Sequence, residues 1–268
     1  MDIELERALT DSLAASRAGR EVCLAVVQNA VRWALQRYPA KEAEKAAKTR
    51  LHQFYGSYVS DGWVKRADKT LAELACGGIG AAQASAALLA LHGSTRERLG
   101  YIEECYGKIF TISGKQATII DIACGLNPVS FCLMGMNGVH LTAADAGSAV
   151  TDILNRFFAL AGMADARAYA CDVTAELPQG RFDLALVMKF LPLAERMDKG
   201  GALKLMNNIN ARHITVSFPT RSLSGRNVGM ERNYSEWFEG LGFEGKIVER
   251  FICGDEVFYI VRGVNYHD

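Results

Sequence analysis

The chain has 268 residues, half of them hydrophobic, and its 30 Lys and Arg balance 30 Asp and Glu. This balance excludes binding to a polyanion through overall charge, so any contact with nucleic acid must come from a local patch. A chain of this size and composition can form an α/β domain with a smaller domain added to it.

The N-terminal stretch MDIELERALTDSL is acidic and amphipathic, whereas a secretion signal is basic and then apolar. No apolar run in the sequence approaches the roughly 20 residues of a membrane-spanning helix. We therefore expect a cytoplasmic protein with no membrane partner.

The seven cysteines are scattered, with no C-x-x-C pair and no neighbouring histidine at ligand spacing. This pattern is not typical of a disulfide framework or a zinc site. We predict buried thiols and no bound metal.

The first part of the chain, residues 1–110, shows helical periodicity and almost no strand signal. Pro39 before KEAEKAAKTRLH predicts the start of one helix, and CGGIG at 76–80 predicts the end of another. We predict an all-helical domain over residues 1–110 and a second domain over residues 111–268.

A basic patch lies within the helical part, where nine basic residues between positions 32 and 69 stand against four acidic ones, a local net charge of +5. On the helix after Pro39, Lys41, Lys45 and Lys48 share one face, and Arg50 follows them. A solvated helix face would explain such a run, but the nearby aromatic residues favour RNA binding.

From about residue 115 short β-branched runs alternate with helices, which predicts a mostly parallel sheet with crossover helices. Only CGD separates the last two runs, so these should form an antiparallel hairpin. Helices are expected near 148–162, 195–210 and 230–241. The seven runs are ATIIDIA, VHLTAAD, ARAYACD, FDLALVMKF, HITVSFP, GKIVERFI and EVFYIVRG.

The first of these runs leads into the turn DIACGLNPVS, residues 121–130. A dinucleotide-binding G-x-G-x-x-G turn would need glycines at 127 and 130, where the chain has Asn127 and Ser130. The turn therefore indicates a nucleotide ligand smaller than NAD.

Polar residues at the ends of successive strands describe that ligand, because the carboxyl ends of parallel strands meet at one edge of a sheet. Asp145 lies 20 residues after Gly125, where a carboxylate accepts from ribose hydroxyls. Asp172 could accept from an adenine amino group, and Asp121 suits a cationic end. Together they predict S-adenosylmethionine. Lys189 ends the fourth run and could equally be a snorkelling surface lysine.

Two motifs that are missing after the fourth strand limit which kinds of atom can accept the methyl group. The chain has KFLPL there, without a Pro-Cys pair for pyrimidine-carbon methylation or an Asn/Asp-Pro-Pro-aromatic motif for exocyclic amines. An acceptor with its own lone pair remains, such as a ring nitrogen or a hydroxyl.

Four segments carry a family resemblance: HGSTRERL (92–99), DIACGLNP (121–128), KFLPLAE (189–195) and SFPTRSLSGRNVGMERNYSEWFE (217–239). Together they resemble the aminoglycoside-resistance ribosomal RNA methyltransferases, which modify N7 of guanine 1405 in 16S rRNA. The resemblance implies a Rossmann-like class I methyltransferase domain, S-adenosylmethionine as cofactor and 16S rRNA within the 30S subunit, not DNA, as partner. It also implies resistance to 4,6-disubstituted deoxystreptamine aminoglycosides.

The resemblance implies a role for several residues. Arg98 would hold the methionine carboxylate, with Gly125 and Asn127 at the same end of the cofactor. Asp145 would accept hydrogen bonds from the ribose, and Asp172 and Val173 would contact the adenine. The wall between the cofactor and the base would consist of Lys189, Leu191 and Pro192. The basic residues Lys41, Lys45, Lys48 and Arg50 would lie on rRNA phosphates. Alternatively, Ser94, Thr95 and Glu97 would form a capping box, a role that is compatible with cofactor binding.

The implied reaction is an in-line displacement in which N7, carrying a free lone pair, needs no general base. Holding two reactants in line can supply roughly 7 to 11 kcal/mol. Candidates to position the guanine, besides Lys189, are Arg221, Arg226, Met230 and Glu231. A nicotinamide-dependent oxidoreductase and a non-catalytic RNA-binding protein remain as alternatives.

Overall fold

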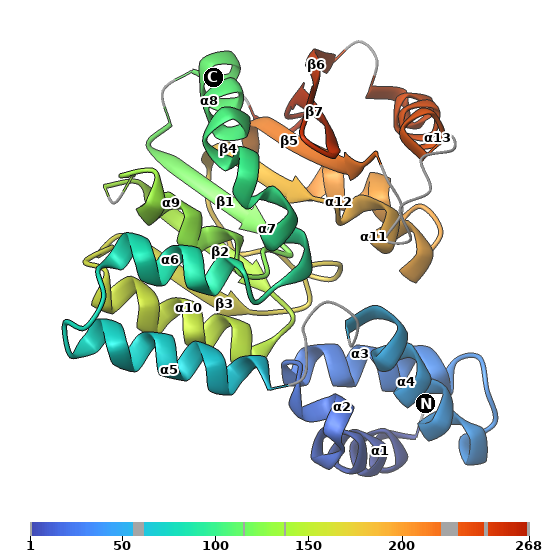
Figure 1. Cartoon of the computed structure of the whole chain (residues 1–268). Coiled ribbons are helices and arrows are strands. Elements are labelled where there is room, and N and C mark those ends of the chain that lie inside the picture. Colours follow the sequence, from blue (N-terminus) through green and yellow to red (C-terminus); the bar gives the residue numbers. More distant parts are fainter. Residues whose placement is uncertain are drawn as a thin grey trace.

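The computed structural model describes residues 2–55, 62–114, 116–136, 138–220, 230–243 and 246–266. Its centre is a seven-stranded sheet in the order β3-β2-β1-β4-β5-β7-β6 (Figure 1). The strands are β1 (Thr118–Ile122), β2 (His140–Asp145), β3 (Ala166–Ala170), β4 (Phe182–Met188), β5 (Ala211–Pro219), β6 (Ile247–Cys253) and β7 (Glu256–Arg262).

The mostly parallel sheet predicted from the sequence is confirmed, and all seven predicted runs are strands. Strands β1 to β5 pair in parallel, and the short connection before β7 produces the antiparallel hairpin. Within this hairpin β7 pairs with β5, so β6 forms the edge of the sheet.

The strands are apolar throughout because both faces of the sheet are covered, which is usual for a parallel sheet. Neighbouring residues pack into opposite cores: Ile119 and Leu184 into one, Ile120 and Ala185 into the other. The first core is covered by α5 (Trp63–Ala75), α6 (Ala81–Leu89), α8 (Ile102–Ser113), α9 (Ser130–Leu133) and α10 (Ser148–Leu160). The second is covered by α11 (Leu191–Met197), α12 (Gly201–Asn208) and α13 (Met230–Phe238).

The prediction of a single helix over residues 195–210 is wrong, because two helices occupy this region. Helix α11 begins earlier, at Leu191, and ends at Met197, and α12 begins at Gly201. Between them Gly200 has a φ of 80°, a left-handed conformation that a continuous helix cannot contain. The other two expected helices correspond to α10 and α13.

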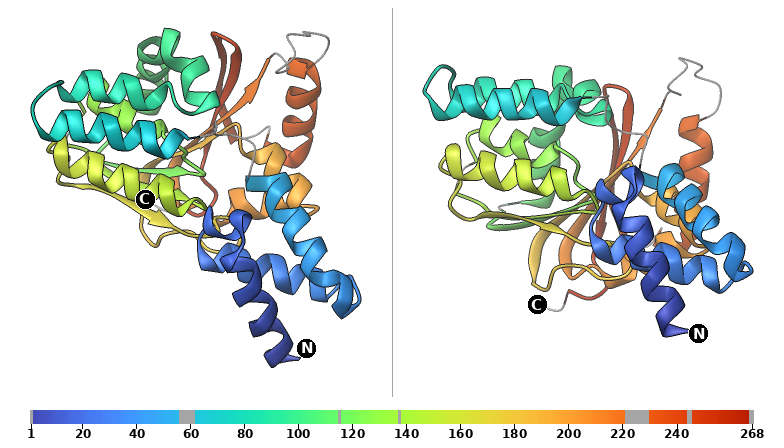
Figure 2. Two further views of the ribbon diagram at one scale, coloured as in Figure 1. Left: turned by 60° about the horizontal axis from the view of Figure 1, so that its bottom comes forward. Right: turned by 90° about the horizontal axis from the view of Figure 1, so that it is seen from below.

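The first four helices form a separate cluster below the sheet in Figure 1, and Figure 2 shows this cluster from two further sides. They have their own hydrophobic core, which includes Val27, Val31 and Leu51. As predicted, a helix begins directly after Pro39 and another ends before CGGIG. These helices are α1 (Ile3–Ala15), α2 (Arg17–Arg20), α3 (Leu24–Leu35) and α4 (Ala40–Tyr55).

The helices α5, α6 and α8 lie within the predicted helical domain of residues 1–110 but share their core with the sheet. The hydrophobic core therefore divides nearer residue 55 than residue 110. The predicted division into two domains, residues 1–110 and 111–268, stays a prediction. Within the described ranges, no helix combines the length and the apolar character needed to cross a bilayer.

The central strands β1 and β4 define the functional edge of this sheet. From β1 the chain order proceeds outward through β2 and β3, and from β4 it proceeds in the other direction through β5. The carboxyl ends of these two strands form the topological switch point, where ligands bind in open α/β sheets.

Candidate active site

The turn after β1 is held in an uncommon backbone conformation. Both Ala123 and Gly125 have positive φ angles, 53° and 51°. A Cβ atom on Gly125 would lie 3.1 Å from Nε2 of His92, so a larger residue would be both strained and crowded. Positive φ at a non-glycine residue such as Ala123 is typical of functional sites, where the surrounding structure stabilises it.

Asp145 at the end of β2 fixes this turn. Its Oδ2 accepts a hydrogen bond from the backbone N–H of Gly125 at 2.8 Å, and its Oδ1 accepts from that of Gly147 at 2.8 Å. Each carboxylate oxygen has a second lone pair that remains for a ligand donor. The predicted ribose acceptor therefore also organises the glycine turn.

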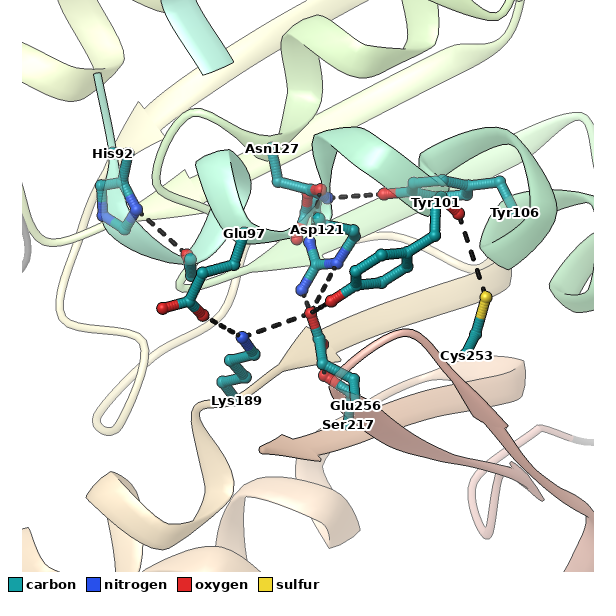
Figure 3. Close-up of polar contacts among 12 residues, drawn as sticks. His92, Glu97, Tyr101, Tyr106, Asp121, Asn127, Lys189, Ser217, Cys253 and Glu256 are labelled. Atoms are coloured by element: carbon teal, nitrogen blue, oxygen red, sulfur yellow. Dashed lines mark hydrogen bonds and ion pairs between the residues drawn. The ribbon is translucent and has the colours of Figure 1, made fainter. Parts of the chain in front are cut away.

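A buried ion pair is centred on Glu256, which Figure 3 labels together with Asn127 of the turn. Arg98, 1% exposed, ends α7 (Gly93–Arg98) and donates from Nε and Nη2 to the two oxygens of Glu256, which is 0% exposed, at 3.1 and 2.9 Å. Its Nη1 donates to Asn127 Oδ1 at 2.9 Å. The bidentate contact fixes the plane of the guanidinium group.

Asn127, which Arg98 holds through Oδ1, in turn orients Asp121. Its Nδ2 donates to Asp121 Oδ2 at 2.7 Å and to the hydroxyl oxygen of Tyr106 at 2.7 Å. The other oxygen of Asp121, Oδ1, is buried and has no hydrogen-bond partner among the described residues. Burial raises the pKa of Asp121 to about 7, although Asn127 and Arg98 oppose this shift.

An incompletely paired buried carboxylate is costly unless a further donor or cation completes its contacts. Asp121 is therefore the residue of the site whose contacts a cationic ligand group would complete.

Lys189 follows directly after β4 and has a φ of 58°, which is unusual for a residue with a side chain. Its Nζ lies 2.8 Å from Glu97 Oε2 and 3.3 Å from Glu256 Oε1. The backbone strain and the two carboxylates give this side chain a defined position, unlike a snorkelling surface lysine.

Glu256 is the centre of this network, and it was absent from the sequence prediction. It also accepts hydrogen bonds from Ser217 Oγ at 2.8 Å and from the Tyr101 hydroxyl at 3.1 Å. Burial would raise its pKa, but the positive charges of Arg98 and Lys189, together with the hydrogen bonds from Arg98 and Ser217, lower it. A lone carboxylate at the start of the apolar run EVFYIVRG was the available signal.

His92 closes the same region above Gly125. Burial, with the charges of Arg98 and Lys189, lowers the pKa of His92 to about 4. Its imidazole is therefore neutral at physiological pH, and its Nδ1 lies 3.0 Å from Ser94 Oγ.

The capping box expected from STRERL is wrong. The residue before α7 is His92, whose side chain makes no capping hydrogen bond, and Thr95 instead donates through Oγ1 to the carbonyl oxygens of Leu89 and His92. Of the two arginines in this segment, Arg96 is exposed and Arg98 is buried.

Asp172, after β3, is buried and held from two sides. Its Oδ1 accepts from Thr174 N–H and Oγ1 at 3.1 and 2.6 Å, and its Oδ2 accepts from Asn29 Nδ2 at 2.8 Å. The neighbouring Val173 is buried, and Leu191 is fully buried in the core under α11.

The predicted RNA contacts lie on α4 of the helical cluster. Lys41, Lys45 and Lys48 are exposed, whereas Arg50 is half-buried. The Arg50 guanidinium carbon lies 4.4 Å from the centre of the Trp33 ring, and Nη2 donates to the carbonyl oxygen of Met197 at 2.9 Å. Arg50 therefore connects the helical cluster to the end of α11.

A groove of about 690 Å³ lies between α3, α4 and the C-terminal end of α11. Aromatic and basic side chains line it together, as is common in sites for single-stranded RNA. Its lining includes Trp33, Arg37, Tyr38, Lys45, Arg196 and Lys199.

Of the four candidates from the 217–239 region to grip the base, Arg221 and Arg226 lie outside the described residues. Met230 and Glu231 begin α13 and are half-buried. Glu231 Oε1 accepts from Nη2 of Arg250 on β6, which places this side chain against the hairpin.

The cysteines only partly follow the prediction of buried thiols. All seven are free, but Cys76 is exposed, and Cys23 and Cys171 are half-buried. Across the described ranges, no group of His, Cys, Asp and Glu has the arrangement of a metal site.

Comparison with known proteins gives consistent matches over most of the chain. The family model described as Ribosomal RNA methyltransferase (FmrO) matches residues 17–260. A 16S rRNA (guanine(1405)-N(7))-methyltransferase of Serratia marcescens is 36% identical over 97% of this chain and 99% of its own. One from Frankia casuarinae is 35% identical over 82% and 80%.

Two solved structures are similar along nearly the whole length. The 16S rRNA methyltransferase RmtF in complex with S-adenosyl-L-homocysteine has a TM-score of 0.85 and 36% identity, covering 98% of this chain and 100% of its own. The 16S rRNA methylase RmtB has a TM-score of 0.79 and 31% identity, covering 96% and 98%.

Proposed function

The chain belongs to the ribosomal RNA methyltransferase (FmrO) family, and on that premise we propose that it methylates N7 of guanine 1405 in 16S rRNA. S-adenosylmethionine is its methyl donor, and the product confers resistance to 4,6-disubstituted deoxystreptamine aminoglycosides. Because the chain belongs to a methyltransferase family, we no longer consider the alternative of a nicotinamide-dependent oxidoreductase. The observation that carries the proposal is the buried Asp121 carboxylate, incompletely paired beside Arg98 at the topological switch point.

The side chains at this edge fit the parts of the cofactor. Asp121 would pair with the methionine ammonium group, and the two remaining N–H groups of Arg98 would face the carboxylate near Gly125 and Asn127. Asp145 would accept from the ribose hydroxyls, and Asp172, with Val173, would receive adenine. Lys189, Leu191 and Pro192 would separate the cofactor from the base.

The chemical step places few demands on this chain. S-adenosylmethionine, when bound, would supply an electrophilic methyl group on its sulfonium. The lone pair of guanine N7 would attack the methyl carbon in line as the carbon–sulfur bond breaks, and S-adenosylhomocysteine would leave. The protein residues need only orient the two reactants and exclude water, because N7 carries no proton to remove. The buried network of Arg98, Asn127 and Glu256 suits that task, since its side chains are fixed before a ligand arrives.

The acceptor is most simply the assembled 30S subunit, because a separate helical cluster can recognise folded RNA by shape. Lys41, Lys45 and Lys48 would lie on rRNA phosphates. The groove beside Trp33 and Arg50 would accept an unpaired stretch of the same RNA. The base itself must leave its stack at a cost of a few kcal/mol, and Arg221, Arg226, Met230 and Glu231 remain our candidates to hold it.

The test is to incubate purified protein with unmodified 30S subunits and S-adenosylmethionine, and then to map the product by borohydride and aniline cleavage with primer extension. A single stop at guanine 1405 is expected. A stop at another base, or no stop while S-adenosylhomocysteine still binds, would contradict the proposal. The second outcome would instead support the non-catalytic RNA-binding alternative.

A further inference from the structure

The cofactor edge of the sheet is not built by the sheet domain alone, because α3 of the helical cluster reaches it at two points. The backbone N–H of Cys23, just before α3, donates to the carbonyl oxygen of Ala146 at 2.8 Å. Ala146 directly follows Asp145 and packs into the core of the helical cluster. Six residues after Cys23, within α3, Asn29 contacts Asp172.

The contact between Asn29 and Asp172 joins residues 143 positions apart in the sequence, with Nδ2 and Oδ2 separated by 2.8 Å. Thr174 holds the other carboxylate oxygen with two donors. Asp172 is only 7% exposed, so its orientation depends on these protein donors more than on water. Removing Asn29 would free one side of this carboxylate.

The chemistry of the donor also matters. A lysine or arginine at position 29 would neutralise Asp172, whereas a neutral amide orients the carboxylate and leaves its negative charge available. Oδ2 accepts one hydrogen bond from Asn29 and retains a lone pair for a second donor, such as the 6-amino group of adenine.

We propose that Asn29 is a positioning residue of the adenosine pocket, through which the N-terminal helices set the affinity for the adenine base. The inference rests on the proposed function, since it requires adenine at Asp172. The helical cluster then has a role in cofactor binding besides its contact with RNA. By linkage, cofactor binding and the packing of α3 against the sheet stabilise each other.

The experiment measures the dissociation constants of S-adenosylhomocysteine and S-inosylhomocysteine by isothermal titration calorimetry. The second ligand carries an oxo group in place of the 6-amino group and cannot donate to Asp172 from that position. For Asn29→Ala, binding of S-adenosylhomocysteine should weaken roughly tenfold, while that of the inosine analogue should change by less than about threefold. The preference of wild type for adenine should therefore shrink.

The matched control is Gln28→Ala, which removes the neighbouring half-buried amide from the same helix and should leave both constants unchanged. Asn29→Asp places a second carboxylate beside Asp172 and should weaken S-adenosylhomocysteine more than Asn29→Ala does. Circular dichroism shows whether each variant folds. If Asn29→Asp does not fold, the binding constants of Asn29→Ala alone test the proposal. With saturating cofactor, Asn29→Ala should bind 30S subunits as wild type does.

Equal weakening of both ligands by Asn29→Ala would reduce Asn29 to a structural support and overturn the proposal. So would unchanged binding of both, or a wild type that does not distinguish the two ligands. These outcomes differ from failure of the proposed function, in which the wild-type chain would bind neither ligand or would leave guanine 1405 unmodified.

Discussion

At the scale of single residues, the site depends on two buried carboxylates with opposite properties. Glu256 is fully paired, and its lowered pKa keeps it charged. Asp121 is incompletely paired, and burial raises its pKa to about 7. The first residue holds the protein's own cations in place, and the second is suited to receive a cation from outside.

Cofactor affinity should therefore depend on pH through Asp121. Its folded pKa is raised, so the carboxyl group holds its proton up to about pH 7 and pairs with an ammonium group only after losing it. Binding of S-adenosylhomocysteine should tighten about tenfold between pH 6 and pH 8, as measured by calorimetry. His92 does not contribute in this window, because its pKa of about 4 leaves it neutral throughout.

The matched variant is Asp121→Asn, which keeps the shape of the side chain and removes its titration. It should bind more weakly at pH 8 and show no dependence on pH between 6 and 8. The same tightening in the variant as in wild type would assign the effect to another group.

Stability should depend on Glu256 more than on any exposed carboxylate. Glu256→Gln leaves Arg98 buried without its counter-charge, and breaking a buried pair in this way costs about 3 to 5 kcal/mol of unfolding free energy. Urea unfolding of the ligand-free protein measures the change. Glu249→Gln, an exposed position on the same hairpin, should change stability by less than about 0.5 kcal/mol. A similar small change for Glu256→Gln would show that the pair does not stabilise the fold.

At the scale of elements, the sequence predicted most of what depends on local pattern. The seven strands and the terminal hairpin follow from the alternation of apolar runs and from the short CGD connection, and the structure confirms them. The break between α11 and α12 was missed because it depends on the conformation of two residues, the extended Asp198 and the left-handed Gly200.

The contacts of the site were predictable only where they follow from strand ends. Asp121, Asp145 and Asp172 lie at successive strand ends in the sequence, so their meeting at one edge could be expected. Glu256 lies 158 positions from Arg98, and only the placement of β7 next to β5 brings it to the site. Asn29 was missed for the same reason, because nothing local indicates that α3 packs against the end of β3.

The basic face of α4 should serve RNA docking without affecting the cofactor. Changing Lys41, Lys45 and Lys48 together to Glu should abolish methylation of 30S subunits, because three phosphate contacts become repulsive. The side chains are exposed, so S-adenosylhomocysteine affinity should stay at the wild-type value. A methyl-transfer assay and calorimetry on the same preparation measure the two effects.

The control for this variant is Arg167→Glu with Lys204→Glu, two exposed charges on the sheet domain, which should retain methylation. Loss of cofactor binding in the α4 variant would show that this helix supports the pocket rather than the RNA. Equal loss of methylation in the control would indicate a general effect of charge.

At the scale of the whole molecule, two bodies with separate cores meet beside the cofactor edge of the sheet. The contacts of Asn29 with Asp172, Cys23 with Ala146 and Arg50 with Met197 join them. An RNA held on the helical cluster would therefore lie close to the methyl donor without either body changing its fold. This arrangement favours one target base, since the distance between the docking surface and the pocket is fixed.

A fixed target base should give a selective resistance pattern. Bacteria expressing the protein should resist kanamycin and gentamicin, both 4,6-disubstituted deoxystreptamines, and remain sensitive to apramycin, because a methyl group on guanine 1405 would affect only drugs that contact this base. Minimum inhibitory concentrations measure the pattern, and cells expressing the Lys41, Lys45 and Lys48 triple Glu variant serve as control with the same cofactor pocket. Resistance to all three drugs would mean that the two bodies deliver a different base to the methyl donor.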